Sequence, residues 1–272
     1  MRLKAYAKIN LGLSVTAKRA DGFHELDTLF ARVSVFDSLR LEPASQGVQL
    51  IVTGAKLPTG PANLCYQAAE AYLKLAGVKT GLSISLEKHI PVAAGLGGGS
   101  SNAAAVLRGL AELYPSDVDL LKLAADLGSD VPFFVLNIPA AHGQGRGEVL
   151  TPAALPAVHV VLANRGVHVS AGEAYRALRS FTSPLHLPDL IASLGTPAPQ
   201  LMNALEPGVL ELYPDITEVL SDLRALGLRG VLMSGSGSTC FGLAASAGEA
   251  ESAAAALKAK RPAWWVRAAS PV

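Results

Sequence analysis

The segment PVAAGLGGGSSNAA, residues 91–104, has four glycines in five positions, followed by two serines and an asparagine. A glycine-rich turn that leads into a helix presents unpaired N–H groups and the positive end of the helix dipole to an anion. Without Cβ atoms, phosphate oxygens can approach the backbone closely. The segment therefore indicates a phosphate site, although a flexible turn would carry similar glycines. We assign to it Pro91, Val92, Ala93, Ala94, Gly95, Leu96, Gly97, Gly98, Gly99, Ser100, Ser101 and Asn102.

Two common phosphate-binding motifs do not fit this phosphate segment (residues 91–102). A P-loop requires G-x-x-x-x-G-K-[ST], and no lysine lies between Pro91 and Arg108. The dinucleotide fingerprint G-x-G-x-x-G begins at Gly95 but meets Ser100 in its third position, and it comes too late for a first βαβ unit. What remains is a loop whose serine hydroxyls bind phosphate or its magnesium ion. The alternative is that Ser100, Ser101 or Asn102 caps the helix.

Two charged residues stand in apolar sequence far apart along the chain. Lys8 lies in AYAKINLGL, residues 5–13, where an alternation of period two places it on one face with Asn10. Asp130 directly precedes VPFF. A strand lysine often marks an exposed edge, and an aspartate between glycine and proline often serves a turn. A carboxylate in an apolar segment is costly unless a cation pairs with it, so Lys8 is a candidate partner of Asp130.

Hydrophobic periodicity predicts the elements that would position these residues. Alternation in residues 81–91 predicts a strand before the phosphate segment, and the spacing of Val106, Leu110 and Leu113 predicts a helix after it. A second glycine segment, MSGSGSTCFG at residues 233–242, lies between apolar runs. Further strands are expected over residues 33–42, 47–54 and 157–166 and within 230–244, and further helices over 63–75, 120–127, 171–180, 214–226 and 248–260.

Composition limits the class of protein. The 272 residues are half apolar and carry a net charge of +1, which gives no reason to expect a nucleic-acid partner. Two distant cysteines suggest neither a disulfide framework nor a zinc cluster, which favours the reducing cytoplasm. Lys8 and Asn10 interrupt any signal-peptide core, and the apolar run at residues 131–141 is too short to cross a membrane. Two prolines in residues 151–156 mark a linker between two α+β lobes.

Taken together, these segments resemble the GHMP kinase superfamily. Residues 91–104 resemble its ATP-phosphate loop, and residues 234–242 resemble its C-terminal glycine motif. AYAKINLGL, RADGFHELDTLF and GSDVPFF resemble the branch whose substrate is a cytidine-diphosphate-linked methylerythritol of the non-mevalonate isoprenoid pathway. The match runs from Lys4 to about Gly242. Homoserine, mevalonate and galactose kinases share the loops but not the DGFHEL segment.

The resemblance implies a two-lobed α+β fold. Residues 1–154 would form an ATP-binding N-terminal lobe like domain 2 of ribosomal protein S5, and residues 155–272 a ferredoxin-like α/β sandwich. ATP would donate its γ-phosphoryl group to the 2-hydroxyl of the small-molecule substrate. Mg²⁺ would accompany the nucleotide, held by phosphate oxygens, a serine and water, with no residue assigned as a dedicated metal ligand. We expect a monomer or weak dimer in the cytoplasm, with no nucleic-acid or membrane partner.

The resemblance also implies roles for individual residues. Lys8 and Asp130 match the catalytic lysine and aspartate, and Asn63 an asparagine near the adenine. Phe23 stands where the family often has tyrosine, which keeps the stacking face and loses only a hydroxyl contact. Lys88 resembles a lysine near the substrate base, although a solvated lysine at a strand end would look the same. The residues expected to bind the substrate are Asn10, Phe23, His24, Lys88, Tyr175, Gly235 and Ser236.

Two alternatives remain open. One is a homoserine- or mevalonate-type kinase of the same superfamily, which would not phosphorylate a cytidine-containing substrate. The other is a regulatory module that binds a nucleotide without turnover, which would consume no ATP.

Overall fold

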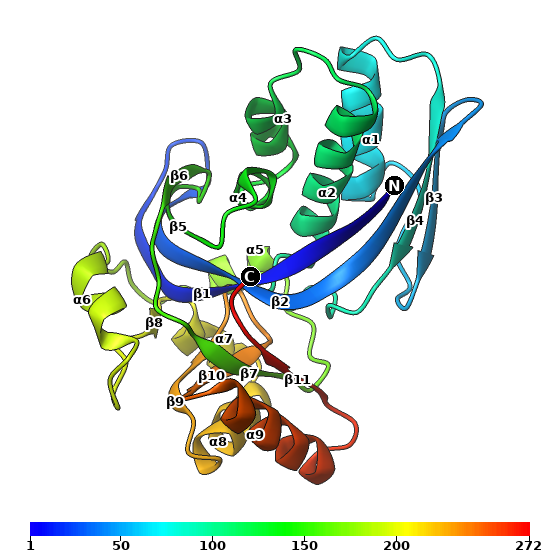
Figure 1. Cartoon of the computed structure of the whole chain (residues 1–272). Coiled ribbons are helices and arrows are strands. Elements are labelled where there is room, and N and C mark those ends of the chain that lie inside the picture. The colour runs from blue at the N-terminus through cyan, green and yellow to red at the C-terminus, as the bar shows by residue number, and fades with distance from the viewer. The chain divides into compact units, whose positions relative to one another are not determined.

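The computed structural model describes residues 1–272, which form two compact units (Figure 1). The first unit comprises Met1–Ala7, Val35–Val92 and Gly97–Ile138, and the second comprises Lys8–Ser34, Ala93–Leu96 and Pro139–Val272. Strands β1 (Arg2–Lys18) and β2 (His24–Ala44) are long enough to contribute residues to both units. The chain therefore enters each unit more than once, and the domain boundary between residues 154 and 155 stays a prediction.

The first unit is a sheet covered by helices. Its strands follow the order β3-β4-β2-β1, with β3 (Val48–Thr53) parallel to β4 (Gly81–Glu87) and β4 antiparallel to β2. Helices α1 (Leu64–Leu75) and α2 (Gly98–Leu113) pack side by side on one face of this sheet (Figure 1). Alternate strand residues such as Leu39, Leu41 and Ile84 are buried there. Helices α3 (Leu120–Leu127) and α4 (Val131–Leu136) complete the unit.

The second unit contains two groups of strands. The end of β1 and the start of β2 associate with β8 (Met202–Asn203) and β5 (Ala140–Gly145), and β6 (Val149–Pro152) pairs with β5. A separate antiparallel sheet has the order β11-β7-β10-β9. Its strands are β7 (His159–Asn164), β9 (Arg229–Met233), β10 (Cys240–Ala244) and β11 (Trp265–Ala269).

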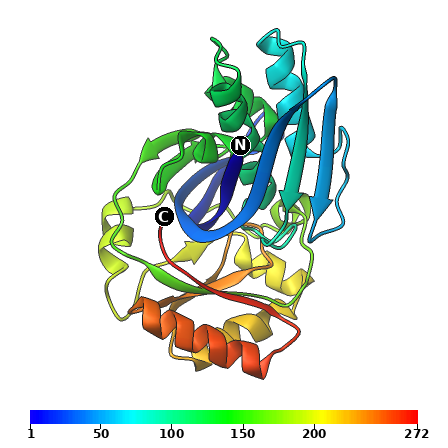
Figure 2. The same ribbon diagram turned by 45° about the vertical axis from the view of Figure 1, so that its right-hand side comes forward.

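Helices α8 (Ile216–Ala225) and α9 (Ala247–Lys260) contact the antiparallel sheet of the second unit, and Figure 2 shows α9 in orange below the strands. Valines, leucines and alanines from these helices and strands form the apolar core of the unit. The remaining helices are α5 (Ala171–Arg176), α6 (Leu187–Ser193) and α7 (Glu206–Leu212).

Most elements predicted from periodicity are confirmed. Helix α1 begins after Asn63, whose side-chain oxygen accepts a hydrogen bond from the N–H of Cys65 at 2.9 Å, and the predicted helix at residues 120–127 is α3. The end of the helix predicted over residues 171–180 is wrong, since α5 stops at Arg176. Just beyond this end, the carbonyl of Ala177 packs closely on Gly208 of α7. Periodicity did not predict the short elements α4, α6, α7, β5, β6, β8 and β11.

Candidate active site

Lys8 and Asn10 form a buried pair on β1. Their side chains are 5% and 2% exposed, and Nζ of Lys8 donates a hydrogen bond to Oδ1 of Asn10 at 2.6 Å. The same ammonium lies over the ring of Phe30, 5.3 Å from its centroid. The backbone N–H of Lys8 donates to the carbonyl of Leu96 at 3.0 Å. The predicted shared face of Lys8 and Asn10 is confirmed, and the interpretation of Lys8 as an exposed edge lysine is wrong.

The two glycine-rich segments meet at Gly95 within the second unit. Gly95 has a φ of +74°, and a Cβ at this position would lie 2.0 Å from the carbonyl oxygen of Ser234. The hydroxyl of Ser234 donates to the carbonyl of Gly95 at 3.0 Å and accepts from the N–H of Asn10 at 3.4 Å. Thr239 N–H donates to the carbonyl of Ala94 at 3.2 Å. The start of the phosphate segment is thus bonded to the second glycine segment.

Gly235 brings the second glycine segment up to the lysine. Its φ is +55°, and a Cβ would lie 3.1 Å from Oδ1 of Asn10 and 3.2 Å from Nζ of Lys8. The buried amide of Asn203 holds this turn by donating to the carbonyls of Met233 at 2.8 Å and Gly235 at 2.7 Å. The structure therefore brings together the predicted residues Lys8, Asn10, Gly95 and Gly235. Ser236 follows on the same turn and is half-buried.

The later part of the phosphate segment opens helix α2 in the first unit. The helix begins at Gly98. Its N-cap residue is Gly97, which has a φ of +67° and no side chain that could cap the helix. Ser100, Ser101 and Asn102 lie inside the helix, so the alternative that one of them is its N-cap is wrong. The first-turn N–H groups face no capping side chain, which suits them to an anion.

A buried ion pair supports this helix start. Lys88 follows β4 and is buried, so the interpretation of a solvated strand-end lysine is wrong. Its ammonium pairs with the fully buried carboxylate of Asp37 and donates to Oδ1 of Asn102 at 3.1 Å. A Cβ on Gly98 would lie 3.2 Å from this ammonium. A positive charge therefore lies against the first turn of α2, and the predicted contact between Lys88 and the substrate base stays a prediction.

Asp130 occupies the N-cap position of α4 and is half-buried. Its side chain makes no capping hydrogen bond to the helix that it precedes. The Asp130 carboxylate therefore does not stabilise this turn by capping the helix. Asp130 belongs to the first unit and Lys8 to the second, and their pairing stays a prediction.

Aromatic residues gather around the turn between β1 and β2. The rings of His24 and Tyr175 are stacked, with centroids 5.0 Å apart and planes 14° from parallel. Phe23 is exposed, and the guanidinium of Arg146 lies 5.1 Å from its ring centroid. Burial and the nearby charge of Lys18 lower the pKa of His24 below its ordinary value. The imidazole is therefore neutral at pH 7 and offers one donor and one acceptor.

Neither cysteine is suited to chemistry. Cys65 and Cys240 are free thiols, and both are buried. Burial raises the pKa of Cys65 to about 12 and raises that of Cys240 well above its ordinary value. Both side chains therefore stay protonated and act as apolar residues.

Sequence reasoning missed several polar residues of these clusters. Asp37 and Asn203 carry no motif of their own, because their importance comes from partners distant in sequence, and Ser234 lies in the second glycine segment but was not among the predicted site residues. For Asp37, the one signal in the sequence was a carboxylate within the strand-like segment VSVFDSLRLE, where an unpaired charge would be costly. Asn63 uses its side chain to cap α1 and to donate to the carbonyl of Pro58 at 2.9 Å, and its contact with adenine stays a prediction.

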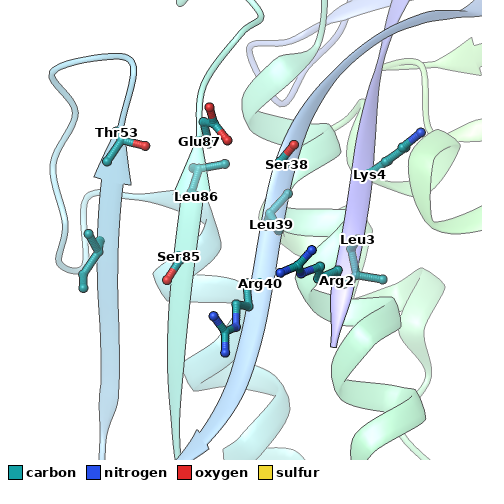
Figure 3. A pocket seen from close by; sticks show the side chains of 11 residues that line it. Arg2, Leu3, Lys4, Ser38, Leu39, Arg40, Thr53, Ser85, Leu86 and Glu87 are labelled. Atoms are coloured by element: carbon teal, nitrogen blue, oxygen red, sulfur yellow. The ribbon is translucent and has the colours of Figure 1, made fainter.

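A surface pocket of the first unit lies away from these residues. Figure 3 shows it on the sheet face that carries Arg2, Lys4, Ser38, Arg40 and Glu87. The helices cover the opposite face, toward which Leu41 points, since a Cβ on Gly109 of α2 would lie 2.5 Å from its side chain. None of the predicted site residues lines this pocket.

Two family models match the chain. The model of the GHMP kinases N terminal domain matches residues 63–137, and that of the GHMP kinases C terminal domain matches residues 187–263. A Deinococcus radiodurans protein named 4-diphosphocytidyl-2-C-methyl-D-erythritol kinase is 50% identical over 275 residues, which cover 97% of this chain and 91% of that protein. No helix of the structure combines the length and the apolar character needed to cross a membrane.

Solved structures agree with these matches. A crystal structure of 4-(cytidine 5'-diphospho)-2C-methyl-D-erythritol kinase is 47% identical, covers 100% of both chains and has a TM-score of 0.89. A homoserine kinase from Cytophaga hutchinsonii has a TM-score of 0.72 over 99% of this chain and 95% of that chain, but its 21% identity shows a shared fold alone. The predicted two-domain GHMP kinase fold is confirmed. The chain belongs to the GHMP kinase family, within the branch of the 4-diphosphocytidyl-2-C-methyl-D-erythritol kinases.

Proposed function

We propose that the chain transfers the γ-phosphoryl group of ATP to the 2-hydroxyl of 4-diphosphocytidyl-2-C-methyl-D-erythritol, giving the 2-phosphate and ADP. The chain is a small-molecule kinase that uses ATP, and relatives named for this substrate match it over nearly its whole length. The observation that carries the mechanism is the buried Lys8–Asn10 pair bordered by Gly235. We place the reaction in the non-mevalonate supply of isoprenoid precursors and the protein in the cytoplasm.

Phosphoryl transfer needs charge stabilisation more than covalent help, because its transition state is loose. Lys8 supplies a buried positive charge to the moving phosphoryl group. Asp130 accepts the proton of the 2-hydroxyl as that oxygen bonds to the γ-phosphorus, and ADP leaves with the electrons of the broken P–O bond. Asn10 is held by Lys8 and has a buried amide, which suits it to orienting the substrate near the lysine.

The nucleotide phosphates bind at the start of α2. The backbone N–H groups of its first turn and the helix dipole attract the anion, and the ammonium of Lys88, whose charge Asp37 offsets, lies beneath them. A Cβ on Gly99 would have no neighbour closer than 3.8 Å, so the space outside this residue is open for a phosphate group.

Magnesium fits this site as part of the nucleotide complex. The structure gathers no group of three or more His, Cys, Asp or Glu side chains for a metal ion. We therefore propose that phosphate oxygens, water and the half-buried hydroxyl of Ser100 hold Mg²⁺. The ion would neutralise phosphate charge as the bond breaks.

The experiment that tests this proposal measures ADP and phosphorylated product with ATP, Mg²⁺ and the cytidylyl-methylerythritol. Turnover of this substrate, but not of homoserine or mevalonate, is expected. Lys8→Met and Asp130→Asn should each lower kcat, the latter by roughly 10²–10⁴-fold as for a general base, while calorimetry shows retained ATP binding. The double variant should lose far less than the product of the two single losses, because residues acting on one step are not additive. Binding of ATP without any ADP formation would instead support the regulatory module.

A further inference from the structure

Behind the Lys8–Asn10 pair lies a third residue that contacts neither substrate nor nucleotide in the roles given above. Thr28 on β2 is completely buried. Nδ2 of Asn10 donates to Oγ1 of Thr28 at 2.8 Å, and Oγ1 in turn donates to the carbonyl of Gly12 at 2.7 Å. We infer that Thr28 is a positioning residue that fixes the orientation of the Asn10 amide and, through it, the ammonium of Lys8.

The direction of this chain of hydrogen bonds follows from the chemistry of its members. A lysine ammonium can only donate, and a backbone carbonyl can only accept. The single proton of the Thr28 hydroxyl goes to Gly12, so this oxygen must accept from the NH₂ group of Asn10. The amide oxygen of Asn10 is then forced toward Lys8, where Nζ donates to it at 2.6 Å. A flipped amide would set two donors against each other at Lys8 and leave Thr28 without its donor.

Packing holds the Thr28 side chain in the rotamer that this chain needs. Strand β5 pairs with β2 so that Gly143 lies opposite Thr28. A Cβ on Gly143 would lie 3.2 Å from the methyl carbon of Thr28 and 2.7 Å from the ring of Phe30. The methyl group thus faces β5 and the hydroxyl faces β1. Because Phe30 also lies beneath the ammonium of Lys8, β2 supports both members of the pair.

Thr28→Val tests the inference because it keeps the methyl group and the shape of the side chain and replaces the hydroxyl with a second methyl. The amide of Asn10 then loses its acceptor in a buried site. We expect kcat to fall by about ten- to a hundred-fold, the rate equivalent of one unsatisfied buried donor, with little change in the KM for ATP. Thr28→Ser keeps the hydroxyl and should restore most of the rate.

Thr16→Val is the matched control. Thr16 lies on β1, and its hydroxyl donates across to the carbonyl of Glu25 on β2 at 3.2 Å, but it has no bond to Asn10 or Lys8. This variant should keep wild-type kcat. Equal kcat losses in Thr28→Val and Thr16→Val, or wild-type kcat in folded Thr28→Val, would overturn the inference.

A second pair of variants covers the case in which Thr28→Val does not fold. Thr28→Ser and Thr28→Ala both lack the methyl group and differ only in the hydroxyl, so a much lower kcat in the alanine variant supports the inference and equal values overturn it. The inference rests on the proposed role of Lys8. Measuring Lys8→Met in parallel distinguishes failure of that role from failure of the positioning by Thr28. Retained turnover in Lys8→Met would refute that role, whereas a dead Lys8→Met beside a fully active Thr28→Val would refute only the positioning by Thr28.

Discussion

Lys88 and Asp37 form an ion pair inside the first unit, where their side chains are 4% and 0% exposed. Asp37 is fully bonded, because it also accepts from the N–H groups of His89 at 2.7 Å and Ile90 at 2.9 Å and from the amide of Asn102 at 2.9 Å. The Asp37 carboxylate therefore bonds both to the residues just before the phosphate segment, His89 and Ile90, and to Asn102 in helix α2 after it. It also offsets the charge of Lys88 at the positive end of the helix dipole.

Asp37→Asn should therefore destabilise the protein strongly, because Lys88 would stay buried and charged without its counter-charge. Breaking one partner of a buried pair costs roughly 3–5 kcal/mol in the free energy of unfolding. Asp37→Asn combined with Lys88→Met removes both charges and should recover much of this loss. Urea denaturation of the two variants and the wild type measures the difference. A double variant as unstable as the single one would show that the hydrogen bonds of Asp37, and not the charge of Lys88, dominate.

The glycines at the start of α2 should separate folding from nucleotide binding. Gly99→Ala places a methyl group in open space at a helical position, so the free energy of unfolding should stay equal or rise by up to about 1 kcal/mol, while ATP affinity falls because the methyl group occupies the phosphate side. Gly98→Val should weaken ATP binding as well, but with a loss of stability, since a Cβ there already lies 3.1 Å from Ile90 and 3.2 Å from Lys88. Calorimetric ATP affinity and thermal melting measure both effects. Unchanged ATP affinity in folded Gly99→Ala would contradict the assignment of the phosphate site.

His24 should make recognition of the cytidine substrate depend on pH. Its pKa is lowered by burial and by Lys18, so the folded protein holds the neutral ring, whose donor and acceptor suit the edge of cytosine. As pH falls through the lowered pKa of the folded histidine, protonation removes the acceptor, and the KM for this substrate should rise more than the KM for ATP. Stability should begin to fall at higher pH, near the ordinary histidine pKa of about 6.5, because the unfolded state binds the proton more readily than the folded state.

His24→Gln is the matched variant for this prediction. Glutamine keeps one donor and one acceptor but does not titrate, so both pH dependences should weaken. His24→Ala should raise the KM for the cytidine substrate at every pH. If His24→Ala changes the KM values for ATP and substrate equally, the histidine serves packing rather than base recognition.

The sequence pointed to several residues of the candidate site but not to the residues that hold them in place. Lys8, Asn10, Gly95 and Gly235 could be singled out because a lysine in an apolar strand and glycine-rich turns are locally unusual. The structure brings these four residues together. The place of Asp130 relative to Lys8 stays a prediction, since it depends on how distant segments assemble.

The residues that hold the site were not predictable in the same way. Thr28 is an ordinary strand residue until its hydroxyl is seen to lie between Asn10 and Gly12. The short helix α4 was missed because VPFFVL is apolar throughout and has no helical periodicity, so only its packing decides its form. Strand β8 has two residues and is defined by its pairing with β1, which no local pattern encodes.

Asn203 should prove as important to the second glycine segment as Asp37 is to the first. It lies on β8 opposite Leu13 of β1, and its NH₂ group donates to the carbonyls of Met233 and Gly235 while its oxygen accepts from the N–H of Leu205 at 2.9 Å. Asn203→Asp replaces the two donors with a carboxylate oxygen that faces two carbonyl oxygens. Because carbonyls cannot donate, the turn at Gly235 should move away from Lys8, and kcat should fall together with stability.

Asn164→Asp provides the control for this last prediction. Asn164 is equally buried, its oxygen also accepts from a backbone N–H, and its NH₂ group donates to Ser238 at 3.1 Å and Thr239 at 3.0 Å. Those partners are hydroxyls, and the hydroxyl of Thr239 can turn to donate to a carboxylate. The same change of charge should therefore cost less here than the roughly 1–3 kcal/mol or more expected for unsatisfied buried polar groups in Asn203→Asp. Denaturation and kcat of both variants give the comparison, and equal losses would mean that burial of the new charge, rather than the two carbonyls beside Gly235, determines the effect.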